Sequence, residues 1–167
     1  MGELGRQVAR GNRAGLLAAL TQAYADEWFA HYNFQFAATN LWGHHSPSTT
    51  ELLARKSGEA FQRTTRLAQR ILELGGRPVS KLTELVEHAT DKPFKLPRSM
   101  SDVQGVLKAV LDAERTSLRT YHRLYLRCRV HDPVTALLAQ EYLAAVVRGE
   151  EELERLIGDP APKLRGT

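Results

Sequence analysis

The chain has 167 residues, of which 43% are hydrophobic and 25% are charged, a composition typical of one globular domain. Its formal net charge of +4 is too small to indicate nucleic-acid binding without a localised basic patch. The mean hydropathy of −0.36 and the lack of a long apolar run predict no membrane span, and no signal peptide is recognisable. The single cysteine, Cys128, excludes an internal disulfide and a multi-cysteine metal site, so we expect a reducing, cytoplasmic location.

Prolines divide the chain into four windows that can hold long helices, because a proline inside a helix removes a hydrogen bond and clashes with the preceding turn. Within each window, apolar residues recur every three or four positions, which is the period of an amphipathic helix. Ser48 and Glu51 form a capping box, and Gly75 follows the second window as a helix stop signal. The sequence predicts long helices over residues 14–42, 48–74, 101–129 and 133–157.

The lengths of the connections predict the topology. The first and third connections are short, so the helices that they join should be antiparallel neighbours. The second connection, residues 75–100, is long and contains three prolines and one short predicted helix, residues 82–88. The expected fold is therefore an all-α, antiparallel four-helix bundle with one long crossover between helices two and three. The predicted division of the chain is a basic flexible tail, the bundle and a short C-terminal tail, at residues 1–13, 14–158 and 159–167.

Four polar residues interrupt the inward apolar stripes near the middle of the helices. Glu27 and His31 lie in the first helix, Arg63 in the second and Glu114 in the third. A buried charge is costly unless it is paired or bound to a metal, so two interpretations stay open. In the first, Arg63 forms an ion-pair cluster with both glutamates. In the second, Glu27, Glu114 and His31 bind a metal ion, since carboxylates and imidazole are metal ligands.

Four segments resemble the ferritin-like superfamily, particularly the Dps-like and bacterioferritin-type proteins. They read LTQAYADEWFAHYNFQFAATNLWGHHSP, RLAQRILELGGRPV, LDAERTSLRTYHRLYL and HDPVTALLAQEYLAAVVRGEEELERL. The resemblance covers about residues 14–157 and has the long crossover in the same place. It implies a ferritin-like bundle that serves iron storage or sequestration, with DNA protection as a further role.

The resemblance also implies where a di-iron site would lie. The family uses one glutamate from helix one, Glu-x-x-His from helix two, one glutamate from helix three and Glu-x-x-His from helix four. Glu27 and Glu114 match two of these six ligands. The other four positions carry residues that are not the expected ligands, namely Ala60, Arg63, Val146 and Gly149. We therefore expect the standard ferroxidase centre to be largely lost, with Arg63 in place of the metal. Iron is the metal that the resemblance implies, and no haem ligand is identified.

Three functional hypotheses follow. The first is an iron-storage or DNA-shielding protein without its own oxidation centre. The alternatives are an active ferroxidase with a rearranged site and a non-catalytic structural subunit that co-assembles with another ferritin-like protein. DNA contacts would come from tail arginines. A basic row on the third helix is interpreted first as solvated or paired with acids, and as a phosphate-binding surface only in the alternative. The tail arginines are Arg6, Arg10 and Arg13.

Assembly is predicted from the aromatic residues of the first helix. Trp28 and Phe29 are adjacent, so they point about 100° apart on a helix and one bundle core cannot bury both equally. We expect a homo-oligomer, a dimer at least, and a closed cage as the resemblance implies, with no membrane partner.

Overall fold

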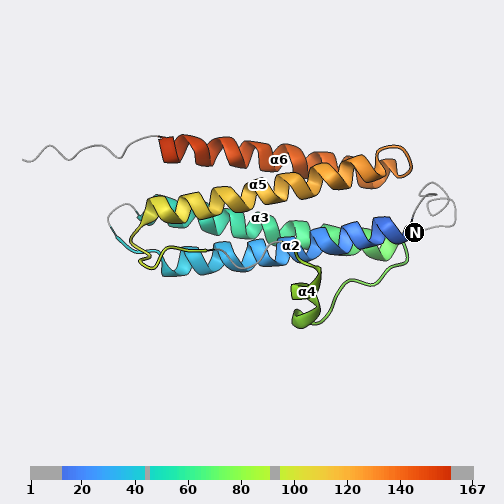
Figure 1. Ribbon diagram of the computed structural model, residues 1–167, viewed down its shortest axis with the longest axis horizontal. Coiled ribbons are helices and arrows are strands. Elements are labelled where there is room, and N and C mark those ends of the chain that lie inside the picture. Colours follow the sequence, from blue (N-terminus) through green and yellow to red (C-terminus); the bar gives the residue numbers. More distant parts are fainter. Residues whose placement is uncertain (1–12, 44–45, 91–94, 159–167) are drawn as a thin grey trace, which may run out of the picture.

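The computed structural model describes residues 13–43, 46–90 and 95–158. The described residues form helices and contain no strand. The helices are α2 (Arg13–Asn40), α3 (Ser46–Glu73), α4 (Leu82–His88), α5 (Val103–Cys128) and α6 (Pro133–Gly158). The predicted all-α bundle and its long crossover are confirmed: four long helices run side by side, and the α3–α5 connection returns along the bundle with α4 projecting from it (Figure 1). The predicted C-terminal tail, residues 159–167, and nearly all of the predicted N-terminal tail lie outside the described residues.

Local sequence signals explain where the helices begin and end. Gly75 adopts a φ of +73°, and the amides of Gly75 and Gly76 donate to the carbonyls of Leu72 and Ile71, both at 2.8 Å. This left-handed ending confirms the predicted stop signal after α3. At the start of α5, the Asp102 side chain accepts the amide of Gly105 at 2.9 Å. The helix therefore begins at Val103 rather than at 101.

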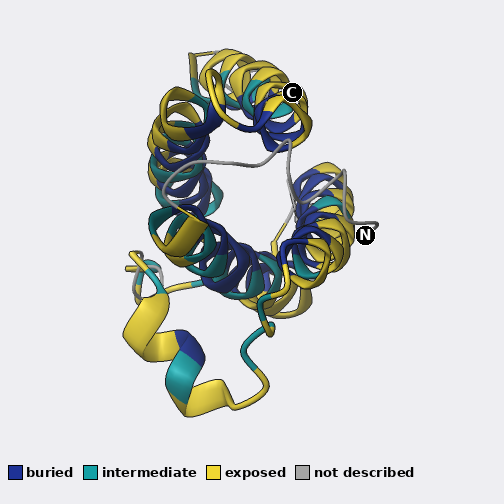
Figure 2. Ribbon diagram, turned by 90° about the vertical axis from the view of Figure 1, so that its right-hand side faces the viewer, coloured by how far each residue is buried: buried dark blue, intermediate teal, exposed yellow. Residues whose placement is uncertain are grey.

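The four long helices enclose two apolar clusters with a polar layer between them. One cluster includes Leu20, Leu67 and Tyr121, and the other includes Phe34, Leu53 and Leu153. Buried residues line the inner side of the ring of four helices, whereas α4 lies outside it and is mostly exposed (Figure 2). α2 packs mainly on α3, and α5 mainly on α6. None of the helices in the described residues is long and apolar enough to cross a membrane.

Candidate functional site

Two ion pairs lie in the polar layer between the apolar clusters. The Nε of Arg63 lies 2.9 Å from Oε2 of Glu27, and the Nζ of Lys56 lies 2.6 Å from Oε1 of Glu114. Glu27 and Lys56 are each 2% exposed, Glu114 is 4% exposed and Arg63 is 9% exposed. The formal charges of the two carboxylates and the two basic side chains sum to zero. Neutrality is what makes such burial tolerable, because an unpaired charge in this position would be strongly destabilising.

Both cations come from one face of α3. Lys56, Ala60 and Arg63 are spaced by four and then three residues, so they form one stripe on the helix. Ala60 is fully buried between them. Lys56 and Arg63 are separated by about 10 Å along the helix axis, at 1.5 Å per residue. Each can therefore meet a different carboxylate, one from α2 and one from α5.

Tyr121 of α5 completes the surroundings of Glu27. Its hydroxyl donates to Oε1 of Glu27 at 2.5 Å, and its ring packs edge-to-face on Tyr142 with centroids 5.2 Å apart. Arg63 engages the other oxygen of Glu27, although its N–H does not point along the line to that oxygen, so the contact is an ion pair without an aligned hydrogen bond. Both carboxylate oxygens of Glu27 are thus engaged by protein groups.

Burial controls the ionisation of this cluster. It raises the pKa of Glu27 above its ordinary value, against the opposing effects of Arg63 and Tyr121. Burial, followed by the charge of Glu27, raises the pKa of Tyr121 well above its ordinary value, so the phenol stays protonated and donates. Burial would lower the pKa of Arg63, but the neighbouring Glu27 outweighs it and the guanidinium stays charged.

Gly149 of α6 leaves the space that the Lys56 ammonium group occupies. A Cβ added at Gly149 would lie 2.8 Å from Nζ of Lys56 and 3.2 Å from Cδ and Oε1 of Glu114. Any side chain at this position would therefore compete with the ion pair. All four long helices thus contribute to the site. Three of them supply its charged side chains, and α6 supplies a glycine that leaves room for them.

The family comparison agrees with this architecture. The model of the Ferritin-like domain family matches residues 17–161. The chain belongs to the ferritin-like domain family. The bundle resembles a dodecameric thioferritin, the bacterioferritin-related protein of Bacteroides fragilis, with a TM-score of 0.88 and 22% identity over 95% of this chain and 94% of that one. It also resembles Dps from Thermosynechococcus elongatus, with a TM-score of 0.82 and 16% identity over 98% and 100% of the two chains. Dps from Staphylococcus aureus gives a TM-score of 0.81 and 19% identity over 88% and 97%. A comparison with curated protein sequences gave no match.

The ferritin-like resemblance assigns metal-ligand positions that the structure brings together without supplying the ligands. Glu27 and Glu114 lie in the polar layer as expected from their inward spacing. The position assigned to the helix-two histidine carries Arg63, and the position assigned to the helix-four histidine carries Gly149. Lys56 extends into the space beside Gly149. Two cationic side chains therefore contact the carboxylates from which a di-iron centre would be built, and the residues present do not fit such a centre.

The expected bridging of both glutamates by Arg63 needs correction. Arg63 pairs with Glu27, whereas Glu114 pairs with Lys56. The physical reason is axial position: Lys56 lies two turns before Arg63 on the same stripe, and Gly149 gives it room beside Glu114. No role was predicted for Lys56, although it lies on the same helical face as Arg63. The seven-residue spacing between Lys56 and Arg63 places both on one face of the helix, and this was the signal for a second inward cation.

His31 lies apart from the two carboxylates. Its Nδ1 is 3.0 Å from the carbonyl oxygen and 2.9 Å from the hydroxyl of Ser57, and its ring packs near Trp28 and Phe61 at centroid distances of 6.0 and 5.3 Å. Within the described ranges, no three His, Cys, Asp or Glu side chains gather as candidate metal ligands. The structure thus brings Glu27, Arg63 and Glu114 into one layer and places His31 between α2 and α3 at its flank.

Of the three arginines that were predicted to contact DNA, the structure describes one. Arg6 and Arg10 lie outside the described residues. Arg13 is the first residue of α2, and its Nε donates to the carbonyl of Leu74 at 2.7 Å. Arg13 therefore satisfies a carbonyl at the end of α3.

Proposed function

We propose that this chain is a Dps-like, ferritin-like protein of iron sequestration that lacks its own ferroxidase centre, and that it works in the cytoplasm as a homo-oligomer. The observation that carries the proposal is the pair of buried cations, Lys56 and Arg63, on the two carboxylates that match the ferritin-like di-iron ligands. Iron is the cargo of such a protein, handled away from the polar layer of each bundle.

Electrostatics support the proposal. A divalent cation is attracted to a site that carries uncompensated carboxylates, whereas the charges of Glu27, Glu114, Lys56 and Arg63 already sum to zero. Entry of a metal would also require the ammonium group of Lys56 to leave Glu114, with which it is in contact at 2.6 Å. Expelling that buried cation would cost its ion pair, so weak iron binding and slow oxidation are expected here.

Anaerobic titration with ferrous iron, followed by exposure to oxygen, tests the proposal. We expect the wild-type protein to bind no stoichiometric pair of irons in the bundle and to oxidise ferrous iron no faster than a protein-free buffer control. Two irons bound per subunit with rapid oxidation would contradict the proposal and favour a rearranged ferroxidase site.

A variant that lacks both cations provides the matched comparison. In Lys56→Ala/Arg63→Ala, two buried carboxylates lose their partners, so redox-inert zinc should raise its melting temperature by binding the native state. The wild-type protein should show no such rise. A variant in which the exposed pairs of Arg55 and Arg66 are removed instead, Arg55→Ala/Arg66→Ala, should behave like the wild type.

A further inference from the structure

A mixed polar and apolar pocket lies where the connection from α3 to α4 leaves the bundle. Its volume of about 430 Å³ falls in the range of about 300–1,000 Å³ that is usual for small-molecule pockets. The connection runs away from α2 and α4 returns to it (Figure 1), and the pocket lies between these three segments. Its lining is formed by Ala18, Thr21, Arg77, Pro78, Val79, Ser80, Lys81, Glu84 and His88.

The segment that forms this pocket is fixed to α2 at both of its ends. At the start, Gly76 packs so closely on α2 that an added Cβ would lie 2.7 Å from Cδ2 of Leu17. At the end, the amide of Thr90 donates to Oδ1 of Asp26 at 2.6 Å, and the side chain of Gln22 donates to the Thr90 hydroxyl. The walls are therefore preformed, so a ligand binds without the entropic cost of ordering them.

α4 presents different faces to two pockets. Leu82, Leu85 and Val86 line an apolar pocket between α4 and the aromatic residues of α2. Glu84 and His88 are four residues apart, so they share a second face of the helix, and this face lines the mixed pocket. The polar side of α4 is thus directed to a site that is chemically distinct from the apolar surface.

Basic side chains converge on the mixed pocket. Lys81 pairs with Glu84 at 3.0 Å, so these two charges compensate each other. Within the part of the chain that the structure describes, Arg77 and His88 have no carboxylate at ion-pair distance. Unpaired arginines such as Arg129 occur elsewhere on the surface, but Arg77 lines a pocket together with a second cation and a histidine. With His88 neutral, the lining keeps a formal charge of +1, from two cations and one carboxylate.

The rest of the lining supplies hydroxyl groups and an apolar wall. The hydroxyls belong to Thr21 and Ser80, and the wall to Ala18, Pro78 and Val79, the last of which packs against a core cluster. A guanidinium binds a carboxylate or a phosphate through two parallel hydrogen bonds. The pocket therefore has donors for an anionic group at one side and a surface for an apolar body at the other.

We propose that this pocket binds a small organic anion, whose carboxylate or phosphate group pairs with Arg77 and accepts further hydrogen bonds from His88 and Lys81. The apolar body of the ligand lies against the wall formed by Pro78 and Val79. The pocket is outside the ring of four long helices, so the proposal does not rest on whether the polar layer binds a metal.

Two anions with the same ring, benzoate and phenyl phosphate, are the probes for this site. Benzyl alcohol, which has the ring without a charge, and inorganic phosphate, which has a charge without the ring, are the comparators. Binding to the full chain is measured by isothermal titration calorimetry at about 150 mM salt, where charges more than about 8 Å apart are largely screened. At least one probe should bind about tenfold more tightly than both comparators, and the tighter probe identifies the anionic group that the site prefers.

A pair of double variants tests the donors. Arg77→Gln/His88→Gln should weaken binding of the tighter probe by at least about tenfold, which is the factor that one charge-assisted hydrogen bond supplies. Arg129→Gln/His131→Gln is the matched control, because it removes an exposed arginine and an exposed histidine from the α5–α6 connection, which does not line the pocket. The control should bind like the wild type.

A steric variant tests the pocket itself. Ala18→Phe keeps every charge and fills the pocket from the α2 side, so it should also weaken binding by at least about tenfold. Ala144→Phe, at an exposed alanine of α6, is its control and should bind like the wild type. Unchanged melting temperatures without ligand control for folding, because all the substituted side chains are exposed.

Four outcomes would overturn the assignment. The first is the absence of binding by both probes at millimolar concentration. The second is equal weakening by the donor variant and its control, which indicates general attraction to surface charge. The third is unchanged binding in Ala18→Phe or in the donor variant, which places the probe elsewhere. The fourth is binding of inorganic phosphate as tight as that of phenyl phosphate, which indicates a site for inorganic anions.

Discussion

Gly149 determines how closely the backbone of α6 approaches the Lys56–Glu114 ion pair. A glycine inside a helix costs about 1 kcal/mol relative to alanine, so its presence here calls for a physical reason. The reason is contact: a methyl group at this position would lie 2.8 Å from the Lys56 Nζ. That atom ends a flexible chain and could move, but moving it would separate it from Glu114 in a buried setting.

Alanine substitutions at two helical glycines should have opposite effects on stability. Gly149→Ala should lower the free energy of unfolding by about 1–3 kcal/mol, because the methyl group overpacks the ion pair. Gly58→Ala is the control: Gly58 is exposed in α3 and a Cβ there would meet nothing within 4 Å, so the variant should gain about 0.5–1 kcal/mol. Urea denaturation measures both. The Gly149→Ala penalty should disappear in a Lys56→Ala background, and a stabilising Gly149→Ala in the wild-type background would show that the space is not needed.

At the scale of single residues, the sequence predicted burial better than pairing. Helical periodicity places Glu27, Arg63 and Glu114 inward, and all three are buried. Periodicity says nothing about the axial offset between helices, which is set by packing and by caps. The partner of Glu114 was therefore not predictable from α3 and α5 alone, since the space for Lys56 depends on Gly149 of a fourth helix.

At the scale of helices, Asp132 connects the start of α6 to α3. Its Oδ1 accepts the amide of Thr135 at 3.2 Å, and both of its oxygens accept from Nη2 of Arg70, at 2.8 and 2.9 Å. The Thr135 hydroxyl also donates to this carboxylate. Asp132 directly precedes Pro133, and an aspartate before a proline is a local signal for the start of a helix. The ion pair with Arg70 was not predictable, because the two residues are 62 positions apart in the chain.

The ion pair between Asp132 and Arg70 should make the stability of the fold depend on pH. Burial tends to raise the pKa of Asp132, but the hydrogen bonds from Thr135 and Arg70 outweigh it and hold the pKa below the ordinary value of 3.8. A folded-state pKa below the unfolded value gives stability that is present above pH 3.8 and is lost as the pH falls through the folded-state pKa.

Asp132→Asn should reveal this contribution. Asparagine remains a good N-cap residue, so the variant mainly removes the charge that faces Arg70. It should be less stable than the wild type by about 1.5–3 kcal/mol at neutral pH, because the buried guanidinium of Arg70 loses its charged hydrogen bonds to Asp132 and keeps Glu73 as a carboxylate partner. The difference in the free energy of unfolding between the two proteins, measured by urea denaturation, should become smaller as the pH falls below 3.8. A difference that stays constant from neutral to acidic pH would show that the Asp132 charge contributes no stability.

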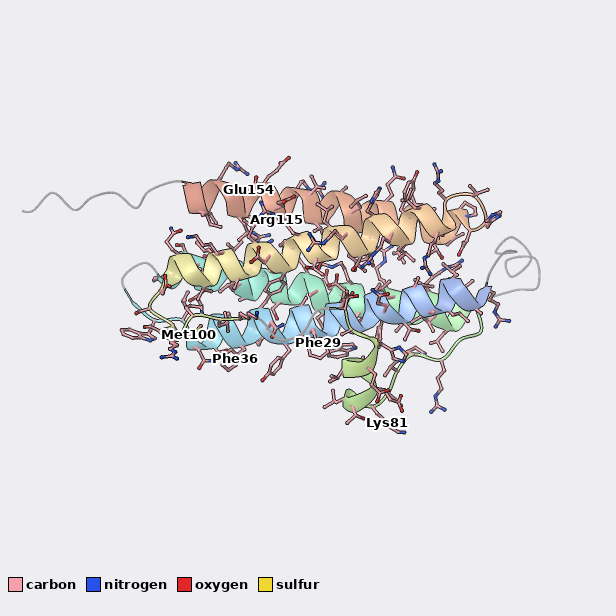
Figure 3. The ribbon with its side chains drawn as sticks, in the orientation of Figure 1. Phe29, Phe36, Lys81, Met100, Arg115 and Glu154 are labelled. Carbon is pink, nitrogen blue, oxygen red and sulfur yellow. The ribbon has the colours of Figure 1, made fainter. Side chains whose placement is uncertain are left out.

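At the scale of the whole molecule, one side of the bundle carries an apolar surface formed by α2 and α4. Figure 3 shows Phe29 and Phe36 on the side of α2 from which α4 projects. A pocket of about 370 Å³ lies between the two helices, and its lining is almost entirely apolar. Tyr32 and Leu82, which line it, are 63% and 80% exposed. Apolar surface gathered in one place is typical of an interface between proteins, which supports the proposed homo-oligomer.

The aromatic residues of α2 show what helical periodicity can predict about assembly. More large apolar side chains lie on α2 than a single inward stripe can bury, and the structure leaves Tyr32 and Phe36 exposed. The excess was visible in the sequence. The participation of α4 was not, because the crossover had to be folded before its Leu82 and Val86 could be placed beside Trp28 and Phe29.

Light scattering of the purified protein should give a mass that is a multiple of the 18.7 kDa chain. Leu82→Lys/Val86→Lys should lower that mass, because two charges would have to be buried without partners at the proposed interface. The variant should still fold, since both side chains are already exposed in the single chain, at 80% and 60%. Leu137→Lys/Val130→Lys is the matched control: those residues are 68% and 72% exposed but lie on α6 and directly after α5, away from this surface, so the mass should stay that of the wild type. A wild-type mass of 18.7 kDa would contradict the proposed homo-oligomer, whereas equal dissociation by both variants would show that the α2–α4 surface is not the specific interface.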